Sequence, residues 1–353
     1  MRDLHLPGRS VAYGSNGAVA TSQQLSSTIA MEVLRHGGNA MDAALTASAV
    51  QSVIEPHNTG IGGDCFALYW RADQKKLYGL NGSGWAPAGL SDKFLLDQGI
   101  NSIALESVHA VTIPGAIDAW SRLLTDHGTR SFPDILAPAI ELAEGGFHVH
   151  ERTAADWEEE VVKLSKDEGA RSQLLINGRA PRAGERMRFP ELATTLRLLA
   201  SEGRDAFYKG SIAQDLVSFL KSKGGSHSLA DFAEFETHYV DPIHAHYRGV
   251  DLYQIPPSGQ GITSLVLLRI LDGFSFQGLD PFGPDRFHLQ IEATQLAYSV
   301  RDAFVADPAF AHVPVDELLS DPFIASLRDK IDLRKASPNL SHIPANFQRD
   351  TIY

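Results

Sequence analysis

Thr351 could act as a nucleophile without a separate side chain as its base. A threonine hydroxyl is a weak nucleophile, but a threonine that is the first residue of a chain can use its own α-amine, with a pKa of about 8, as the base. Thr351 follows Asp350 in the sequence RDTIY. This chemistry therefore requires cleavage of the bond between Asp350 and Thr351. The presence of a single threonine does not by itself decide whether that cleavage occurs.

Two glycine-rich segments are further candidates. The sequence GIGGDC at 60–65 approaches a dinucleotide-binding fingerprint, but Cys65 replaces its last glycine and the expected order is helix, turn, strand rather than strand, turn, helix. We predict a tight turn there, with a cradle for a substrate or an oxyanion as the alternative. In NGSGWAP at 81–87, Ser83 lies between two glycines without the G-x-S-x-G pattern of α/β hydrolases. Trp85 and Trp120 either stack on a substrate or, more commonly, pack in the core.

Two histidine pairs have a spacing that suits metal binding. On a strand, His148 with His150, or His244 with His246, would place both rings on one face. The chain has 14 histidines, so such pairs arise by chance, and neither pair has a carboxylate-rich cluster beside it. We predict no metal site, and no motif implies another cofactor.

Short strands and longer helices must position these residues. The pattern predicts strands at 17–22, 65–73, 75–82, 107–113 and 247–257, and helices at 26–38, 39–56, 116–128, 132–146, 261–274 and 285–307. The segment 151–240 is more charged and mostly helical, as expected of a helical layer or lobe. Paired strands separated by pairs of helices favour a layered α+β fold over a doubly wound parallel sheet.

Composition narrows the class of protein. With 353 residues, 43% hydrophobic and 21% charged, the chain is typical of a folded protein with one large domain or two. Its net charge of −12 repels nucleic acids and anionic membranes. Cys65 is the only cysteine, no apolar run is long enough to span a membrane, and the first residues lack the features of a signal peptide. We expect a cytoplasmic protein that binds neither nucleic acid nor membranes.

Several blocks of the sequence, in the same order, resemble the γ-glutamyltranspeptidase family. They lie at 17–69, 81–90, 110–120, 135–147, 253–263 and 349–353. The resemblance implies an N-terminal nucleophile hydrolase with a four-layer αββα sandwich, made as one precursor that cleaves itself into a large and a small subunit. It places the nucleophile at Thr351, so residues 1–350 would be the large subunit and 351–353 the start of the small subunit. The mature enzyme would be a heterodimer of the two.

The reaction that the resemblance implies is hydrolysis or transfer of an acyl group. The Thr351 hydroxyl attacks a substrate amide, the freed α-amine takes the proton, and water or an acceptor amine then removes the acyl group. The implied substrates are γ-glutamyl compounds such as glutathione, or related amides. Most oxyanion donors of the family belong to the small subunit, so this chain alone should be inactive.

Ser83 departs from the family pattern. True γ-glutamyl enzymes carry an arginine in the segment that matches NGSGWAP, where it pairs with the glutamyl α-carboxylate. Here Ser83, with Trp85 two places later, occupies the matching position, and the lost charged hydrogen bond is worth about 1.5 to 3 kcal/mol. A cephalosporin-acylase-like amidase of a non-glutamyl substrate is therefore an alternative, as is a non-catalytic homologue that binds a small ligand.

Overall fold

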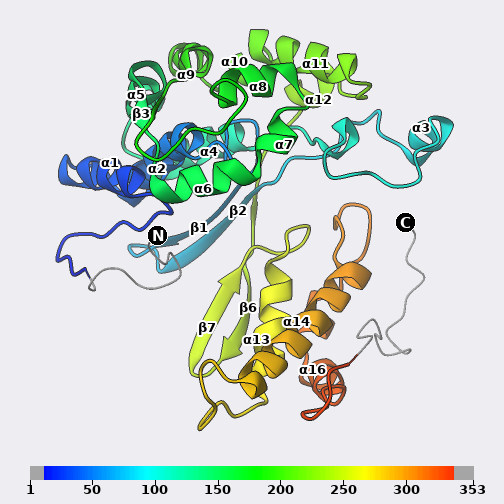
Figure 1. Cartoon of the computed structure of the whole chain (residues 1–353). Helices are drawn as coiled ribbons and strands as arrows, with labels where there is room; N and C mark the ends of the chain where they lie inside the picture. The colour runs from blue at the N-terminus through cyan, green and yellow to red at the C-terminus, as the bar shows by residue number, and fades with distance from the viewer. Residues whose placement is uncertain (1–11, 338–353) are drawn as a thin grey trace. The chain divides into compact units, whose positions relative to one another are not determined.

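The chain forms two units, seen in this computed structural model of residues 12–337 (Figure 1). The first unit contains the chain up to Cys65 and from Gly82 to Thr237. The second contains Phe66–Asn81 and the chain from His238 onward. The predicted division between a large subunit and the start of a small subunit, after residue 350, lies outside the described residues and stays a prediction.

The first unit is mainly helical. Its helices are α1 (Gln24–Arg35), α2 (Ala40–Ile54), α3 (Asp92–Asp97), the 3₁₀ turn η1 (Val108–Ala110), α4 (Ala116–His127), α5 (Phe132–Gly145), α6 (Glu151–Glu159), α7 (Val161–Leu164), α8 (Glu168–Leu174), α9 (Pro190–Glu202), α10 (Arg204–Tyr208), α11 (Ser211–Ser222) and α12 (Leu229–Ala233). A short antiparallel ladder of β3 (Phe147–His148) and β4 (Arg186–Met187) pairs Phe147 with Met187. The helices α6 to α12 confirm that the middle segment is mostly helical.

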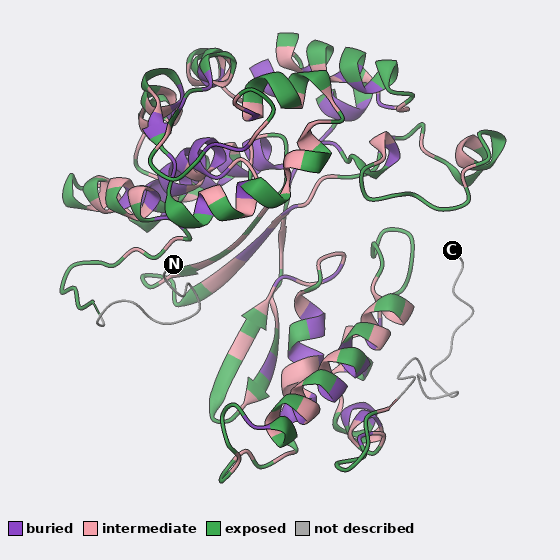
Figure 2. Ribbon diagram, in the orientation of Figure 1, coloured by how far each residue is buried: buried purple, intermediate pink, exposed green. Residues whose placement is uncertain are grey.

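Helix α2 is the most buried helix of this unit (Figure 2). It buries 11 of its 15 residues, three of them alanine, and it packs against α1, α4 and α5. Small side chains let neighbouring helices approach closely, and each fully buried Val or Ile contributes about 1.5 to 3 kcal/mol. The predicted buried helix at 39–56 is therefore confirmed.

The second unit combines short strands with helices. Its elements are β1 (Cys65–Arg71), β2 (Lys76–Gly82), β5 (His238–Val240), β6 (Ile243–Tyr247), β7 (Val250–Gln254), α13 (Gly261–Asp272), α14 (Pro284–Phe304), α15 (Val315–Leu318) and α16 (Asp321–Arg328). One sheet has the order β1-β2-β5, and β6 pairs with β7 so that Ile243 lies opposite Gln254. Val266, Leu296 and Phe323 pack together in a core formed by α13, α14 and α16.

Two of the predicted strands are wrong. Residues 17–22 have no strand geometry, and Val19 packs instead against alanines of α1 and α2. In the predicted strand at 107–113, the Ser107 hydroxyl accepts a hydrogen bond from the His109 N–H at 3.2 Å and starts the turn η1. A strand needs a neighbouring strand for its backbone groups, and within residues 12–337 neither segment has one.

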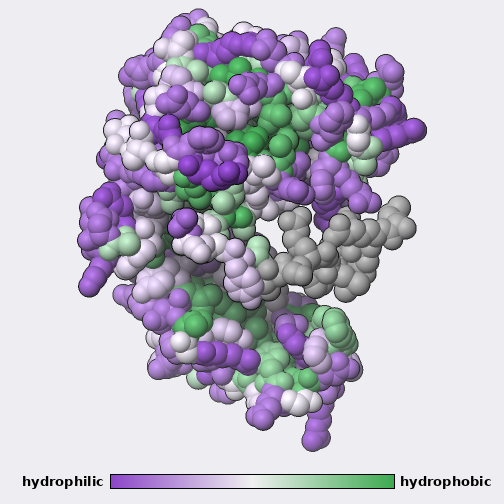
Figure 3. Space-filling view, turned by 90° about the vertical axis from the view of Figure 1, so that its left-hand side faces the viewer, coloured by the Kyte–Doolittle hydropathy of each residue, from purple (hydrophilic) through white to green (hydrophobic). Residues whose placement is uncertain are grey.

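Strand β1 exposes one apolar face. Phe66, Leu68 and Trp70 alternate along β1, so their side chains share a face, and 42 to 56% of each residue is exposed. On the face that Figure 3 presents, hydrophobic side chains reach the surface among hydrophilic ones. Contiguous exposed apolar surface is typical of a contact with another chain or segment.

None of the helices within residues 12–337 has the length and apolar character needed to span a bilayer.

Candidate active site

Ser83 lies where two backbone segments cross at very short range. Gly84 has a φ of +80°, and a Cβ there would lie 2.0 Å from the Ile113 carbonyl oxygen. A Cβ on Gly115 would lie 2.0 Å from the carbonyl oxygen of the residue before Ser83. Only glycine fits at these two positions. We call this contact of residues 82–85 with residues 113–115 the glycine crossing; it fixes Ser83 relative to the start of α4.

The predicted turn at 60–65 is confirmed, and it supports the same contact. The Gly63 N–H donates to the Gly60 carbonyl at 3.2 Å, which closes the turn. The Gly63 carbonyl then accepts the N–H groups of Gly115 and Ala116, both at 3.0 Å. The first N–H groups of a helix have no partner within the helix, so Gly63 satisfies those at the start of α4. A cradle for a substrate at this turn remains untested.

Cys65, directly after the turn, is not a nucleophile at neutral pH. Burial and the negative charge of Asp64 raise the pKa of its thiol to about 11, although a hydrogen bond with Trp120 acts in the other direction. The thiolate is the reactive form of cysteine, so a protonated thiol is inert. Trp120 itself is 4% exposed, and it packs in the core as the commoner alternative predicted.

Trp85 packs on one side and is exposed on another. Its indole ring meets Phe235 edge-to-face at 5.2 Å, and its Nε1–H donates to the Asp231 carbonyl oxygen at 3.4 Å. The residue is nevertheless 37% exposed. Ser83 is half-buried, and its hydroxyl donates to the Gly84 carbonyl oxygen at 3.4 Å. The structure thus brings Ser83 and Trp85 into one short segment, and their predicted role in substrate binding stays a prediction.

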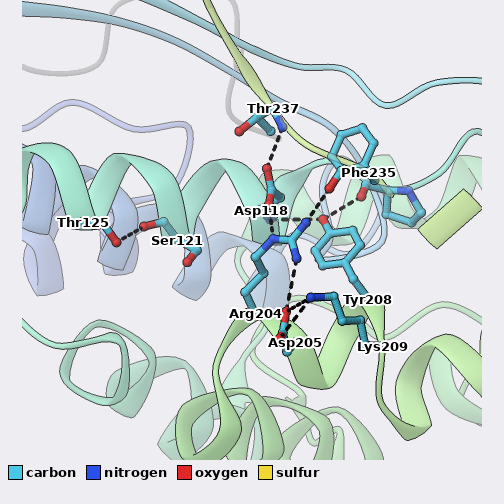
Figure 4. A network of polar contacts seen from close by, with 10 residues as sticks. Asp118, Ser121, Thr125, Arg204, Asp205, Tyr208, Lys209, Phe235 and Thr237 are labelled. Carbon is cyan, nitrogen blue, oxygen red and sulfur yellow. Dashed lines mark hydrogen bonds and ion pairs between the residues drawn. The ribbon is translucent and has the colours of Figure 1, made fainter. Parts of the chain in front are cut away.

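An ion pair between a buried aspartate and a half-buried arginine supports the glycine crossing (Figure 4). Asp118 on α4 pairs with Arg204 at the start of α10, and its second oxygen accepts the Thr237 N–H at 2.7 Å. The Tyr208 hydroxyl donates to the Pro114 carbonyl oxygen at 2.7 Å and accepts the Asp118 N–H at 3.1 Å. The network therefore joins α4, α10 and the chain before β5 at the turn next to the crossing.

Arg204 and Tyr208 of this network both keep their protons at neutral pH. Burial acts to lower the pKa of Arg204, but the hydrogen bond and charge of Asp118 outweigh it, and the pKa is raised. Burial raises the pKa of Tyr208, so its hydroxyl stays neutral and can donate. The Arg204 guanidinium also lies 4.5 Å over the Tyr208 ring, which stacks on Phe235 at 5.7 Å.

A polar cavity of about 410 Å³ lies beside the ion pair. It is lined by Asp118, Ser121, Arg122, Thr125, Asp126, Arg204, Glu236 and Thr237. The lining carries both signs of charge, which suits a small polar ligand better than an apolar one. It contains no histidine, lysine or terminal amine. Its hydroxyls therefore lack the adjacent nitrogen base that an N-terminal threonine supplies to itself.

Sequence reasoning missed Asp118, Arg204 and Tyr208. Asp118 lies in AIDAW between apolar residues on the buried side of the predicted helix. A charged residue at a core position needs a partner, and this was the available signal. Arg204 lies 86 residues further along the chain, a separation that no helical or strand periodicity connects.

The other predicted residues do not come together at this site. Thr351 and Asp350 lie outside the described residues, and their roles stay predictions. His148 and His150 form hydrogen bonds with backbone groups, His246 lies 3.0 Å from Asp251, and the His244 ring contacts a tyrosine. Across residues 12–337, no three or more His, Cys, Asp or Glu side chains are grouped so that they could hold a metal ion.

Comparisons with known proteins give a consistent result. The family model "Gamma-glutamyltranspeptidase" matches residues 26–352. The Glutathione hydrolase-like YwrD proenzyme of Bacillus subtilis is 34% identical over 319 residues, which are 90% of this chain and 60% of that protein. The cephalosporin acylase of Bacillus halodurans has a TM-score of 0.85 and 36% identity, over 94% of this chain and 62% of that chain. The γ-glutamyltranspeptidase of Helicobacter pylori has a TM-score of 0.85 and 25% identity, over 93% of this chain and 95% of that chain.

These matches settle the fold and the family. The structural neighbours confirm the predicted fold of an N-terminal nucleophile hydrolase, with helices and sheets combined. The chain spans about 60% of the length of the Bacillus subtilis relative. Because the family model covers nearly all of the sequence and solved members share the fold, the chain belongs to the gamma-glutamyltranspeptidase family.

Proposed function

We propose that this chain is the large-subunit part of a precursor that cleaves itself before Thr351 and then hydrolyses or transfers the acyl group of amides. The match of the family model through residue 352 carries the proposal, because it includes both Asp350 and Thr351. The lengths of the relatives support a subunit. The chain covers 95% of the crystallised Helicobacter pylori chain but only 60% of the Bacillus subtilis proenzyme. Its partner is then the small subunit from the same precursor.

Self-cleavage would free the nucleophile. The Thr351 hydroxyl attacks the Asp350 carbonyl carbon, the C–N bond breaks, and the hydroxyl proton passes to the Thr351 nitrogen, which becomes the new α-amine. Water then opens the resulting ester, which leaves the Asp350 carboxylate and the free Thr351 hydroxyl.

Turnover would use the same hydroxyl. It attacks the carbonyl carbon of the substrate amide and passes its proton to the α-amine, which gives it to the departing amine. The acyl group is left as an ester on Thr351. Water or an acceptor amine removes it, which separates hydrolysis from transfer.

The proposed substrates are γ-glutamyl compounds such as glutathione, or related amides. The name of the Bacillus subtilis relative supports the first class. A cephalosporin-acylase-like amidase is the second candidate, and the neutral Ser83 in the glycine crossing favours it. The 36% identity with the Bacillus halodurans acylase points the same way.

The role of Thr351 is tested in the full-length precursor. Thr351→Ala should leave one intact chain without amidase activity, and Thr351→Ser, which keeps a hydroxyl, should still cleave. Denaturing gels and mass spectrometry follow the cleavage, and end-group sequencing identifies the new N-terminus. A small subunit that begins anywhere other than at Thr351 contradicts the proposal. A wild-type precursor that never cleaves but binds a small ligand supports the non-catalytic alternative.

The two substrate classes are separated by two anilides. A 4-aminobutyryl anilide lacks only the α-carboxylate of a γ-glutamyl anilide. If no charged group binds that carboxylate, the kcat/KM values of the mature enzyme for the γ-glutamyl anilide and for the 4-aminobutyryl anilide should differ by less than about tenfold. A preference of more than about 100-fold for the γ-glutamyl anilide would show that a charge elsewhere replaces the arginine.

We also propose a cytoplasmic location. The support is compositional, since a chain with Cys65 as its only cysteine needs no oxidising compartment. Fractionation of cells that express the full-length gene tests it, and recovery of the protein outside the cytoplasm contradicts it.

A further inference from the structure

We propose that Glu292 on α14 is a positioning residue for self-cleavage. It holds the chain at Ser337, on the way to the bond before Thr351. This inference rests on the proposed function, because it concerns the cleavage step of the same reaction.

The contact joins a buried carboxylate to a backbone N–H. Glu292 is 2% exposed, and its Oε1 accepts the Ser337 N–H at 3.1 Å. His288 lies one helical turn earlier on α14, and its Nε2 lies 2.7 Å from the Asp332 carbonyl oxygen. Two side chains of one helix therefore bind the backbone of the segment 332–337.

The same segment is anchored on its N-terminal side. The Arg328 side chain, at the end of α16, donates to the carbonyl oxygens at the end of α13, with Nε 3.1 Å from that of Ile270 and a second contact to that of Arg269. The chain is thus fixed at residue 328 on α13 and at residues 332 and 337 on α14. Ser337 is the last of these contacts along the described chain.

The Glu292 carboxylate contributes little to the stability of the fold. Its Oε2 is buried without a hydrogen-bond partner among the described residues, and Leu289, Ala293 and Leu296 on the same helix belong to the apolar core. Burying that oxygen without a partner costs free energy, which an apolar side chain of similar size would recover at the loss of one hydrogen bond of modest net strength. What the carboxylate provides is an acceptor for the Ser337 N–H at a fixed point.

That point matters because self-cleavage is intramolecular. Ser337 lies 14 residues before Thr351 in the sequence. The rate of an intramolecular reaction depends on how well the reacting groups are held, and a small misplacement costs a large factor. Fixing the chain at Ser337 sets the point from which the sequence continues to the bond before Thr351.

The test measures the cleavage rate of the full-length precursor. Glu292→Met, which has no acceptor, should slow cleavage roughly tenfold. Glu292→Gln, which keeps an acceptor oxygen, should restore most of the rate. The Tm of Glu292→Met, measured with Thr351→Ala so that the chain stays intact, should be unchanged or higher. A wild-type rate in Glu292→Met, or slow cleavage together with a lowered Tm, overturns the proposal.

Ser337 supplies a matched pair of variants. Ser337→Pro removes the N–H and should slow cleavage as Glu292→Met does, whereas Ser337→Ala keeps the N–H and should cleave at the wild-type rate. The double variant Glu292→Met with Ser337→Pro should be no slower than either single variant. Equal effects of Ser337→Pro and Ser337→Ala, or additive effects in the double variant, overturn the role of this hydrogen bond. Failure of the wild-type precursor to cleave refutes the proposed function itself, and this inference with it.

Discussion

At the scale of single residues, a charge inside the core organises the neighbourhood of Ser83. Asp118 satisfies three groups at once, since its carboxylate binds Arg204 and the Thr237 N–H while its own N–H reaches the Tyr208 hydroxyl. Because the Tyr208 hydroxyl also donates to the Pro114 carbonyl oxygen, Asp118 is linked through Tyr208 to the backbone of the glycine crossing. Its sequence signal, a charge among apolar residues, indicated that a partner exists but not which residue it is.

Removing the Asp118 carboxylate should therefore be costly. Asp118→Ala leaves the Thr237 N–H without its acceptor and removes the buried ionic partner of Arg204, so we expect the free energy of unfolding to fall by about 2 kcal/mol. Asp205→Ala is the matched control, since Asp205 also pairs with Arg204, at 3.2 Å, but its side chain is 61% exposed. We expect that control to cost less than about 1 kcal/mol. Urea unfolding measures both, and equal losses would show that the burial of Asp118 is unimportant.

At the scale of elements, Asp42 connects the start of α2 to the chain before α5. Its Oδ2 accepts the Asn39 N–H at 2.8 Å and the Thr129 hydroxyl at 2.6 Å, and its Oδ1 accepts the N–H groups of Thr129 and Arg130. Burial acts to raise the pKa of Asp42, but these hydrogen bonds outweigh it and lower the pKa. A residue that sequence patterns identify only as a helix cap thus joins two helices.

The lowered pKa of Asp42 predicts a pH dependence. The unfolded carboxyl takes up its proton near pH 3.9, whereas the folded one does so at a lower pH. Its contribution to stability is therefore complete above the unfolded pKa and is lost as the pH falls through the folded pKa. Asp42→Asn should lower the free energy of unfolding by about 3 kcal/mol at pH 7, and the difference from the wild type should shrink below about pH 3.

Asp134 is the control for Asp42. It has the same capping-box position in α5, but it is exposed, and within residues 12–337 its carboxylate accepts hydrogen bonds from Ser131 alone. Asp134→Asn should cost less than about 1 kcal/mol. Thermal unfolding across pH 2 to 7 measures both variants, and equal losses would contradict the role assigned to Asp42.

Helices were predictable from the sequence where their ends carry local signals. Asn39 and Asp42 begin α2, Ser131 and Asp134 begin α5, and Gly37, with a φ of +84°, follows α1. These interactions lie within a few residues of one another, so a sequence pattern shows them. The segments 17–22 and 107–113 have the apolar pattern of strands, but pairing depends on distant residues that no local pattern specifies.

At the scale of the whole molecule, the site was only partly predictable. Ser83 and Trp85 were found because their segment resembles a family motif, and the structure places them in one tight crossing. The interactions that hold the crossing join segments up to 119 residues apart, as between Asp118 and Thr237. The proposed nucleophile, Thr351, lies outside the described residues. The sequence therefore identifies individual residues of the site but not the long-range contacts that bring them together.

Residues 1–353 alone should have no amidase activity. An oxyanion hole needs N–H groups that are free to bind the developing charge, and one such donor is worth about 10² to 10³ in rate. At the glycine crossing the N–H groups of Ile113, Gly115 and Ala116 already bind backbone carbonyls. We therefore expect turnover of a γ-glutamyl anilide by the isolated chain to be at least about 100-fold below that of the processed full-length protein. The two proteins are compared at equal concentration, and equal turnover would mean that residues 1–353 hold a complete site.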